Sequence, residues 1–279
     1  MTHVIGRGFG RGSVAGSGAG RAGFAEAVRA EWVKFRTIQA TVISTLATIG
    51  VGIHFAFAFG SATVRDYFDA APADRADFDP MMLATARPFM ITMIAAGVIG
   101  VLAVTSEYAS GTIRVSAVAV PARHRLFAAK ATVVGSVTLV AGQLVALPVF
   151  LISQSVLARA NVPSVTLAGP HVVRAVVGGG LCLTLTSLLG VAFGFLLRAS
   201  AGAIAVTTLV VILPTMAPLF PDWLGDLIGK YWPSTAGLRV TAIRPDPDLL
   251  APGTGFAVMC GYVAVLLAAA LTAFRNRAV

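Results

Sequence analysis

The stretch TSEYASGTIRVSAVAVPARHRLFAAK, residues 105–130, decides how this chain is organised, because it is a polar interruption between two long apolar segments. It contains Glu107 and four basic residues, Arg114, Arg123, Arg125 and Lys130. A charge at the centre of a bilayer costs about 2.5 to 3.5 kcal/mol on insertion scales, so this stretch is too polar to lie in hydrocarbon. We interpret it as a cytoplasmic loop that contacts a partner protein.

The composition places the rest of the chain in lipid. Of its 279 residues, 57% are hydrophobic and only 12% are charged, whereas soluble domains carry about 25% charged residues. The mean hydropathy is +0.84. The net charge of +9 does not indicate nucleic-acid binding, because the lysines and arginines fall between apolar runs and form no continuous basic face.

Six apolar segments have close to the roughly 20 residues that a helix needs to cross the hydrocarbon. They lie near residues 41–59, 88–105, 126–152, 172–197, 201–220 and 253–274. We expect Pro88 in the first turn of its helix, where the missing N–H costs nothing. Three further prolines, Pro148, Pro214 and Pro218, should kink their helices, with neighbouring helices bonding the carbonyls that they free. The sequence therefore predicts an all-α polytopic membrane protein with one domain at residues 24–279.

The segments outside the spans differ in composition. Residues 1–23 are rich in Gly and Arg, which predicts a disordered tail. Residues 24–38 place apolar side chains at helical spacing, which predicts an amphipathic helix at the membrane surface; the first turns of the next helix remain an alternative. Residues 61–86 are Asp-rich and loop-like, and residues 221–232 favour a short outer helix.

Charge predicts the orientation. Six spans put both termini on one side, and a cytoplasmic N-terminus places thirteen of the twenty-one lysines and arginines inside. Nine of the twelve acidic residues then lie outside. We expect a multi-pass protein of the plasma membrane with both termini in the cytoplasm.

The spans offer little for catalysis. No Asp, Glu or Lys lies at the middle of a predicted span, and His54 is the only histidine well inside one. Nothing indicates a catalytic set, a metal site or a bound cofactor. Gln143, Thr184 and Ser187 are mild polar residues that pack helices together or line a substrate path, with packing as the default. Gly190 and Gly194 form a GxxxG pair that favours close helix approach or a dimer contact.

Two stretches resemble a known family. They are EWVKFR at residues 31–36, ahead of the first span, and EYASGTIR at residues 107–114, followed by Pro121, Arg123 and Lys130. PSTAG at residues 233–237 is a weaker echo. In order and topology, residues 24–277 resemble the permease subunits of type-2 (ABC-2) ABC transporters, especially those of actinobacterial type. The long Gly/Arg tail departs from the usual short N-terminus of that family.

The resemblance implies a transmembrane permease subunit of an ATP-driven exporter. A short coupling helix between spans two and three would contact a cytoplasmic ATPase subunit, which binds ATP and Mg, so this chain is not itself an enzyme. A second permease subunit, identical or different, and membrane lipid are the other implied partners. The coupling loop comprises Glu107, Gly111, Thr112, Ile113, Arg114, Pro121, Arg123, Arg125 and Lys130, and the connecting helix includes Glu31, Trp32, Lys34 and Arg36.

Within this loop the sequence does not decide between a helix and a strand. Thr112 suits the start of a helix that ends before Pro121, but the alternation of residues 113, 115 and 117 also fits a short strand. We further hypothesise that Glu107 pairs with Arg29, Lys34 or Arg36 of the connecting helix. A polytopic membrane enzyme or a membrane scaffold without transport activity is the alternative function.

Overall fold

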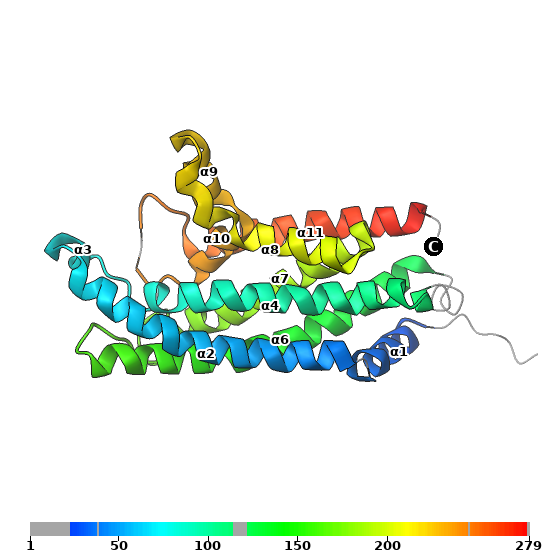
Figure 1. Cartoon of the computed structure of the whole chain (residues 1–279), viewed down its shortest axis with the longest axis horizontal. Helices are drawn as coiled ribbons and strands as arrows, with labels where there is room; N and C mark the ends of the chain where they lie inside the picture. The colour runs from blue at the N-terminus through cyan, green and yellow to red at the C-terminus, as the bar shows by residue number, and fades with distance from the viewer. Residues whose placement is uncertain (1–22, 38, 114–121, 245, 278–279) are drawn as a thin grey trace, which may run out of the picture.

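The computed structural model describes residues 23–37, 39–113, 122–244 and 246–277. Within these ranges the chain forms helices and connecting turns, with no strand. Six helical segments are long and apolar enough to cross a membrane. They make an elongated bundle, with α1 and the C-terminus at one end of the long axis and α3 at the other (Figure 1). We refer to these as the α1 end and the α3 end.

The described helices follow the predicted order. α1 at Phe24–Thr37 precedes the first long helix and confirms the helix expected there. The six long segments are α2 at Gln39–Asp69, α4 at Met82–Ala109, α6 at Arg123–Arg159, α7 at Val172–Leu197, α8 at Ser200–Ile212 continued by the 3-10 helix η1 at Leu213–Leu219, and α11 at Pro252–Asn276. The short elements are α3 at Pro72–Ala76, α9 at Asp222–Tyr231, α10 at Pro233–Leu238 and η2 at Arg239–Thr241.

The helix boundaries match the predictions unevenly. The segment at residues 172–197 coincides with α7, whereas α2 continues ten residues beyond the expected end at residue 59. Its 31 residues extend about 46 Å, more than the roughly 30 Å of hydrocarbon. The prediction that residues 61–86 form a loop was therefore wrong over much of its length, because α2 runs to Asp69 and α3 and the start of α4 fall in the same stretch.

The expectation that Pro88 lies in a first turn was also wrong, because α4 begins six residues earlier. A proline at this place leaves the carbonyl of Ala84 without its usual N–H donor. Ser153 of α6 supplies the replacement, since its hydroxyl donates to that carbonyl at 3.2 Å. A hydrogen bond between helices thus lets α4 continue through the proline.

The helix type changes where Pro214 and Pro218 occur. The α-helical part of the fifth span ends at Ile212 and continues as the 3-10 helix η1. Pro214 leaves the carbonyl of Val210 without its helical donor. The indole N–H of Trp232 bonds this carbonyl at 2.7 Å, so the expected compensation by a neighbouring segment is confirmed here.

α7 is the central helix, and it packs closely on α4 and α6. Its glycines make this possible. A side chain on Gly190 would collide with the carbonyl oxygen of Gly97 on α4, and one on Gly100 of α4 would collide with the carbonyl oxygen of Ser187. Gly142 of α6 meets the backbone of Gly180 in the same way. Gly190 of the predicted GxxxG pair therefore serves packing within the chain.

At the α3 end of the bundle, the side chain of Asp79 links two connecting segments by hydrogen bonds. One carboxylate oxygen accepts the backbone N–H groups of Met81 and Met82, where α4 begins. The other accepts those of Ile243 and Arg244, in the segment between η2 and α11, at 2.9 and 3.0 Å. This single buried carboxylate joins two connections that are more than 160 residues apart.

Candidate functional site

The candidate site is a cluster of four charged side chains at the α1 end, three of them buried and Lys34 partly exposed. α1 contributes Glu31 and Lys34, which are neighbours at i and i+3 on one face of the helix. Glu31 lies on the same stripe as Ala27 and Phe35, which are buried in the core. The packing of this stripe carries the Glu31 carboxylate into the bundle.

The long helices contribute the other two members. Glu107 lies in the last turn of α4, and Lys130 lies two turns after the start of α6. Both are nearly inaccessible, with 2% and 3% of their surface exposed. In the sequence the two residues stand on either side of residues 110–122, so the cluster connects both flanks of this polar segment to α1.

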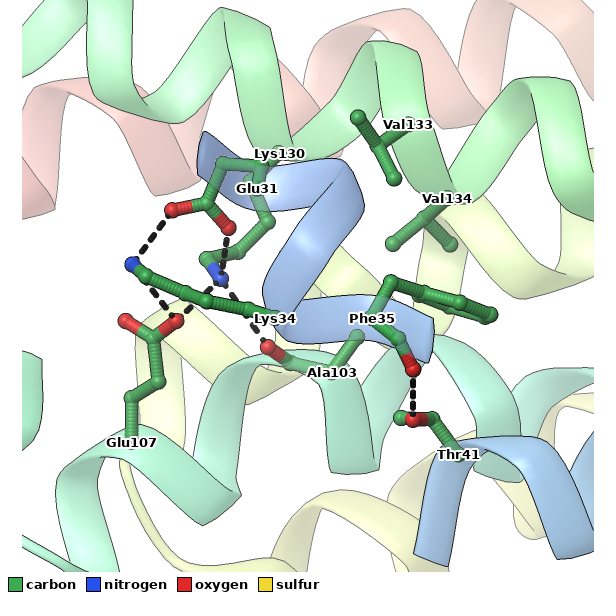
Figure 2. Close-up of a pocket in the computed structure, with 9 residues that line it drawn as sticks. All are labelled: Glu31, Lys34, Phe35, Thr41, Ala103, Glu107, Lys130, Val133 and Val134. Carbon is green, nitrogen blue, oxygen red and sulfur yellow. Dashed lines mark hydrogen bonds and ion pairs between the residues drawn. The ribbon is translucent and has the colours of Figure 1, made fainter. Parts of the chain in front are cut away.

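Figure 2 shows the four side chains converging, with Lys130 between the two carboxylates. The Lys130 ammonium lies 2.5 Å from Glu31 Oε2 and 2.8 Å from Glu107 Oε1, and donates to the carbonyl of Ala103 at 3.1 Å. Lys34 contacts the same two acids, at 2.6 Å from Glu31 Oε1 and 3.1 Å from Glu107 Oε1. Each ammonium thus bridges two carboxylates that belong to different helices.

The cluster is electrically balanced, since two carboxylates face two ammonium groups. Burial raises the pKa of Glu31, but the charges and hydrogen bonds of Lys130 and Lys34 outweigh it, so this pKa lies below its ordinary value. Burial lowers the pKa of Lys34, and the contacts with Glu31 and Glu107 outweigh that effect and raise it. Glu31 and Lys34 are therefore both charged at neutral pH.

The space beside the cluster is too small for a substrate. Its volume is about 10 Å³, on the scale of a single water molecule. It is bordered by the four charged residues together with Phe35, Thr41, Ala103, Val133 and Val134. The cluster therefore joins α1, α4 and α6 by ion pairs and leaves no room for a substrate beside it.

The pKa directions predict how this junction responds to pH. Stability from Glu31 is fully present above the ordinary carboxyl pKa of about 4.3 and is lost as the pH falls through its lower folded-state pKa. Stability from Lys34 is present below about pH 10.4 and is lost as the pH rises through its raised pKa. We expect the difference in melting temperature between the wild type and Glu31→Gln to stay constant between about pH 5 and 10 and to shrink below about pH 4.

The matched control for this measurement is Glu26→Gln, an exposed carboxylate on the same helix that accepts the backbone N–H of Gly23. Its melting temperature should follow the wild type closely at every pH. A difference between wild type and Glu31→Gln that remains unchanged at acid pH would contradict the assignment of Glu31 as a charged, stabilising partner.

The predicted coupling loop is only partly described. Gly111 has a positive φ of 71°, where a residue without Cβ is favoured, and it turns the chain directly after α4. Thr112 and Ile113 are helical, and Ile113 is buried. Arg114 and Pro121, and with them most of the predicted coupling helix at residues 111–121, lie outside the described residues. The choice between helix and strand stays a prediction there.

Arg123 anchors the far flank of the loop. Its guanidinium donates to the carbonyls of Phe274 and Arg277 at 3.0 and 2.7 Å, at the end of α11. Arginine at this place bonds carbonyls that have no partner inside their own helix. The start of α6 is thereby fixed to α11, while Lys130 fixes it to α1 and α4. Arg125 between them is half-buried.

No family model and no curated protein matches the chain. The role of the site is therefore inferred from its own contacts. Within the described part of the chain, no group of three or more His, Cys, Asp or Glu side chains is arranged to hold a metal ion.

The hypothesised pairing of Glu107 is found with Lys34, one of the three residues named for it. Arg29 and Arg36 lie on the exposed face of α1, together with Trp32. Sequence reasoning missed the stronger link between Glu31 and Lys130. A signal existed, because a glutamate between Ala27 and Phe35 on the apolar face of an amphipathic helix requires a buried cation.

Of the residues expected to pack helices or line a path, Ser187 is buried, whereas Gln143 and Thr184 are partly exposed. Gln143 of α6 donates to the carbonyl of Val177 on α7 at 3.2 Å, which makes it an interhelical contact. Thr184 bonds the carbonyl of Gly180 in its own helix. Ser187 is buried, and its hydroxyl has no hydrogen-bond partner among the described residues. Of the three, Gln143 alone forms a side-chain hydrogen bond between described helices. For Thr184 and Ser187 the choice between packing and a substrate path stays a prediction.

Proposed function

We propose that this chain is the transmembrane permease subunit of an ATP-driven exporter, with ATP and Mg bound by a separate cytoplasmic ATPase subunit. The resemblance of residues 31–36 and 107–114 to type-2 ABC permeases motivates the proposal. The observation that carries it is the charged cluster, because its four members join α1, α4 and α6 at both flanks of the polar loop. Because its flanks are joined to α1, α4 and α6, a push on this loop is transmitted to those three helices.

The proposed mechanism is rigid-body coupling. A partner that changes shape with ATP pushes on residues 110–122, and the cluster makes α1 and the adjoining ends of α4 and α6 move together. The close backbone contact between α4 and α7 carries the motion to the central helix. Transport then follows from tilting these helices against a second permease subunit, in a plasma membrane with both termini in the cytoplasm.

The test is purification of the tagged full-length chain from its own cells, followed by assay of ATP hydrolysis in the eluate. We expect ATPase activity to co-purify with the wild type. Ala109→Arg adds bulk and charge at the exposed last residue of α4, beside the loop, and should reduce this activity at least about tenfold by weakening docking. The melting temperature of the chain should not change, because Ala109 is exposed.

The control is Asn276→Arg, which adds the same charge at the exposed last residue of α11, at the same end of the bundle. It should retain the co-purifying activity. An eluate without ATP hydrolysis above background, or equal activity in both variants, would reject the proposal and favour a scaffold, which does not respond to nucleotide.

A further inference from the structure

An apolar groove runs along the surface of the bundle between α2 and α6. It has a volume of about 330 Å³ and starts at Trp32 of α1. Its remaining lining consists of Thr45 and Ile49 from α2 and Ser136, Val137, Val140, Ala141 and Leu144 from α6. Val140 and Leu144 are more than half exposed, so the groove is open to the surroundings of the bundle. Its lining matches a hydrocarbon chain.

The α1 end of this groove is basic. Arg29, Trp32 and Arg36 occupy positions i, i+3 and i+7 of α1 and therefore share one face of the helix. All three side chains are exposed. No carboxylate of the described residues forms an ion pair with either arginine, and Lys34 on the neighbouring face is engaged in the buried cluster. Two arginines thus flank the tryptophan at the mouth of the groove.

We propose that the groove is a binding site for an anionic phospholipid. The phosphate lies between Arg29 and Arg36, the indole of Trp32 packs at the level of the headgroup, and an acyl chain follows the groove between α2 and α6. Tryptophan and arginine are suited to the membrane interface, and anionic lipid attracts basic side chains near the surface. This inference needs only a membrane-embedded chain and is independent of the proposed transport function.

The charges favour lipid over a second copy of the chain as the occupant. In a symmetric contact each copy presents the same surface patch to its partner. Such a contact over this face would bring a second pair of arginines towards Arg29 and Arg36 instead of an opposite charge. An anionic headgroup supplies the complementary charge and the apolar chain in one molecule.

The test uses the fluorescence of Trp32, one of three tryptophans in the chain. The full-length chain is reconstituted in vesicles of ordinary phosphatidylcholine. A minor fraction of the lipid is brominated on its acyl chains and is either phosphatidylglycerol or phosphatidylcholine. Bromine quenches the fluorescence of nearby indoles. The signal of Trp32 is the part of the quenching that Trp32→Phe removes. We expect phosphatidylglycerol to bind in preference to phosphatidylcholine by about fivefold for each arginine.

Two variants and one control separate the parts of the site. Arg29→Gln/Arg36→Gln should abolish the preference, whereas Arg275→Gln, an exposed arginine at the same end of the bundle, should retain it. Ser136→Phe fills the exposed groove and should weaken quenching by both lipids. Equal quenching of Trp32 by both lipids in the wild type, or a preference that survives the double substitution, would overturn the proposal. So would shielding of Trp32 from both lipids, which indicates a second copy over the groove.

Discussion

Replacing Lys130 by methionine is expected to lower the free energy of unfolding by about 3 to 5 kcal/mol, the range observed when one partner of a buried ion pair is removed. Lys130 contacts Glu31, Glu107 and the backbone carbonyl of Ala103 at once. Without it, two buried carboxylates share Lys34, whose side chain is 32% exposed. Thermal or denaturant unfolding of the purified chain in detergent measures the loss.

The double variant Lys130→Met/Glu107→Gln tests the reason for this loss. It removes one charge of each sign and leaves Glu31 paired with Lys34, so it should cost less than the two single substitutions added together. Arg125→Met is the control for charge removal near the start of α6, and we expect a change below about 1 kcal/mol from this half-buried residue. Equal losses for Lys130→Met and Arg125→Met would show that the cluster does not stabilise the fold.

A single methyl group at Gly100 should have an effect of similar size. The Cβ of alanine at this position would collide with the carbonyl oxygen of Ser187 and lie 2.9 Å from the backbone nitrogen of Val191. Both atoms belong to the backbone of α7 and cannot rotate away, so α4 and α7 must separate. We expect Gly100→Ala to destabilise the chain by about 3 kcal/mol, at the upper end of the cost of overpacking.

Gly50→Ala supplies the matched comparison for Gly100→Ala, again by unfolding in detergent. Gly50 lies in α2, and a Cβ there meets no atom within 4 Å. Since alanine favours the helix over glycine by up to about 1 kcal/mol, this variant should be neutral or slightly stabilising. If Gly100→Ala were as stable as Gly50→Ala, this would contradict the close contact between the backbones of α4 and α7.

The charged cluster and the glycine contact at Gly100 hold α4 at two different places along its length. The charged cluster ties its last turn to α1 and α6, and the glycine contact fixes its middle against α7. We expect a helix held at both places to move as a body with its neighbours instead of bending alone. This is the mechanical property that the proposed coupling requires.

The sequence predicted the elements well because each depends on local composition. The central run at residues 172–197 was found with its observed bounds, since it is predominantly apolar and bounded by His171 and Arg198. Errors arose where tertiary contacts override local signals. Pro88 indicates a helix start by itself, but a hydrogen bond from Ser153 to the carbonyl of Ala84 allows the helix to pass through it.

The candidate site was predicted in part for the same reason. The residues of the loop flanks and the connecting helix were selected from the sequence, and so was a pairing of Glu107 with α1. The signal for Glu31 was present in its position on an apolar face, but it could not identify Lys130 as the partner. The two residues are 99 positions apart, and only the packing of α1 against α6 brings them to 2.5 Å.

By itself, therefore, the sequence determined that this chain forms six apolar helices with an amphipathic helix before them, because hydrocarbon solvent admits few other structures for such a composition. Tertiary structure alone decided that α7 is central, that its glycines face α4 and α6, and that Lys130 joins two acids from different helices. The physical reason is that helix formation depends on neighbours along the chain, whereas ion pairing and close packing depend on which helix ends meet in space. The polar stretch at residues 105–130 shows both. Its composition predicts a segment outside the hydrocarbon, and only the folded contacts of Glu107 and Lys130 connect its flanks to α1.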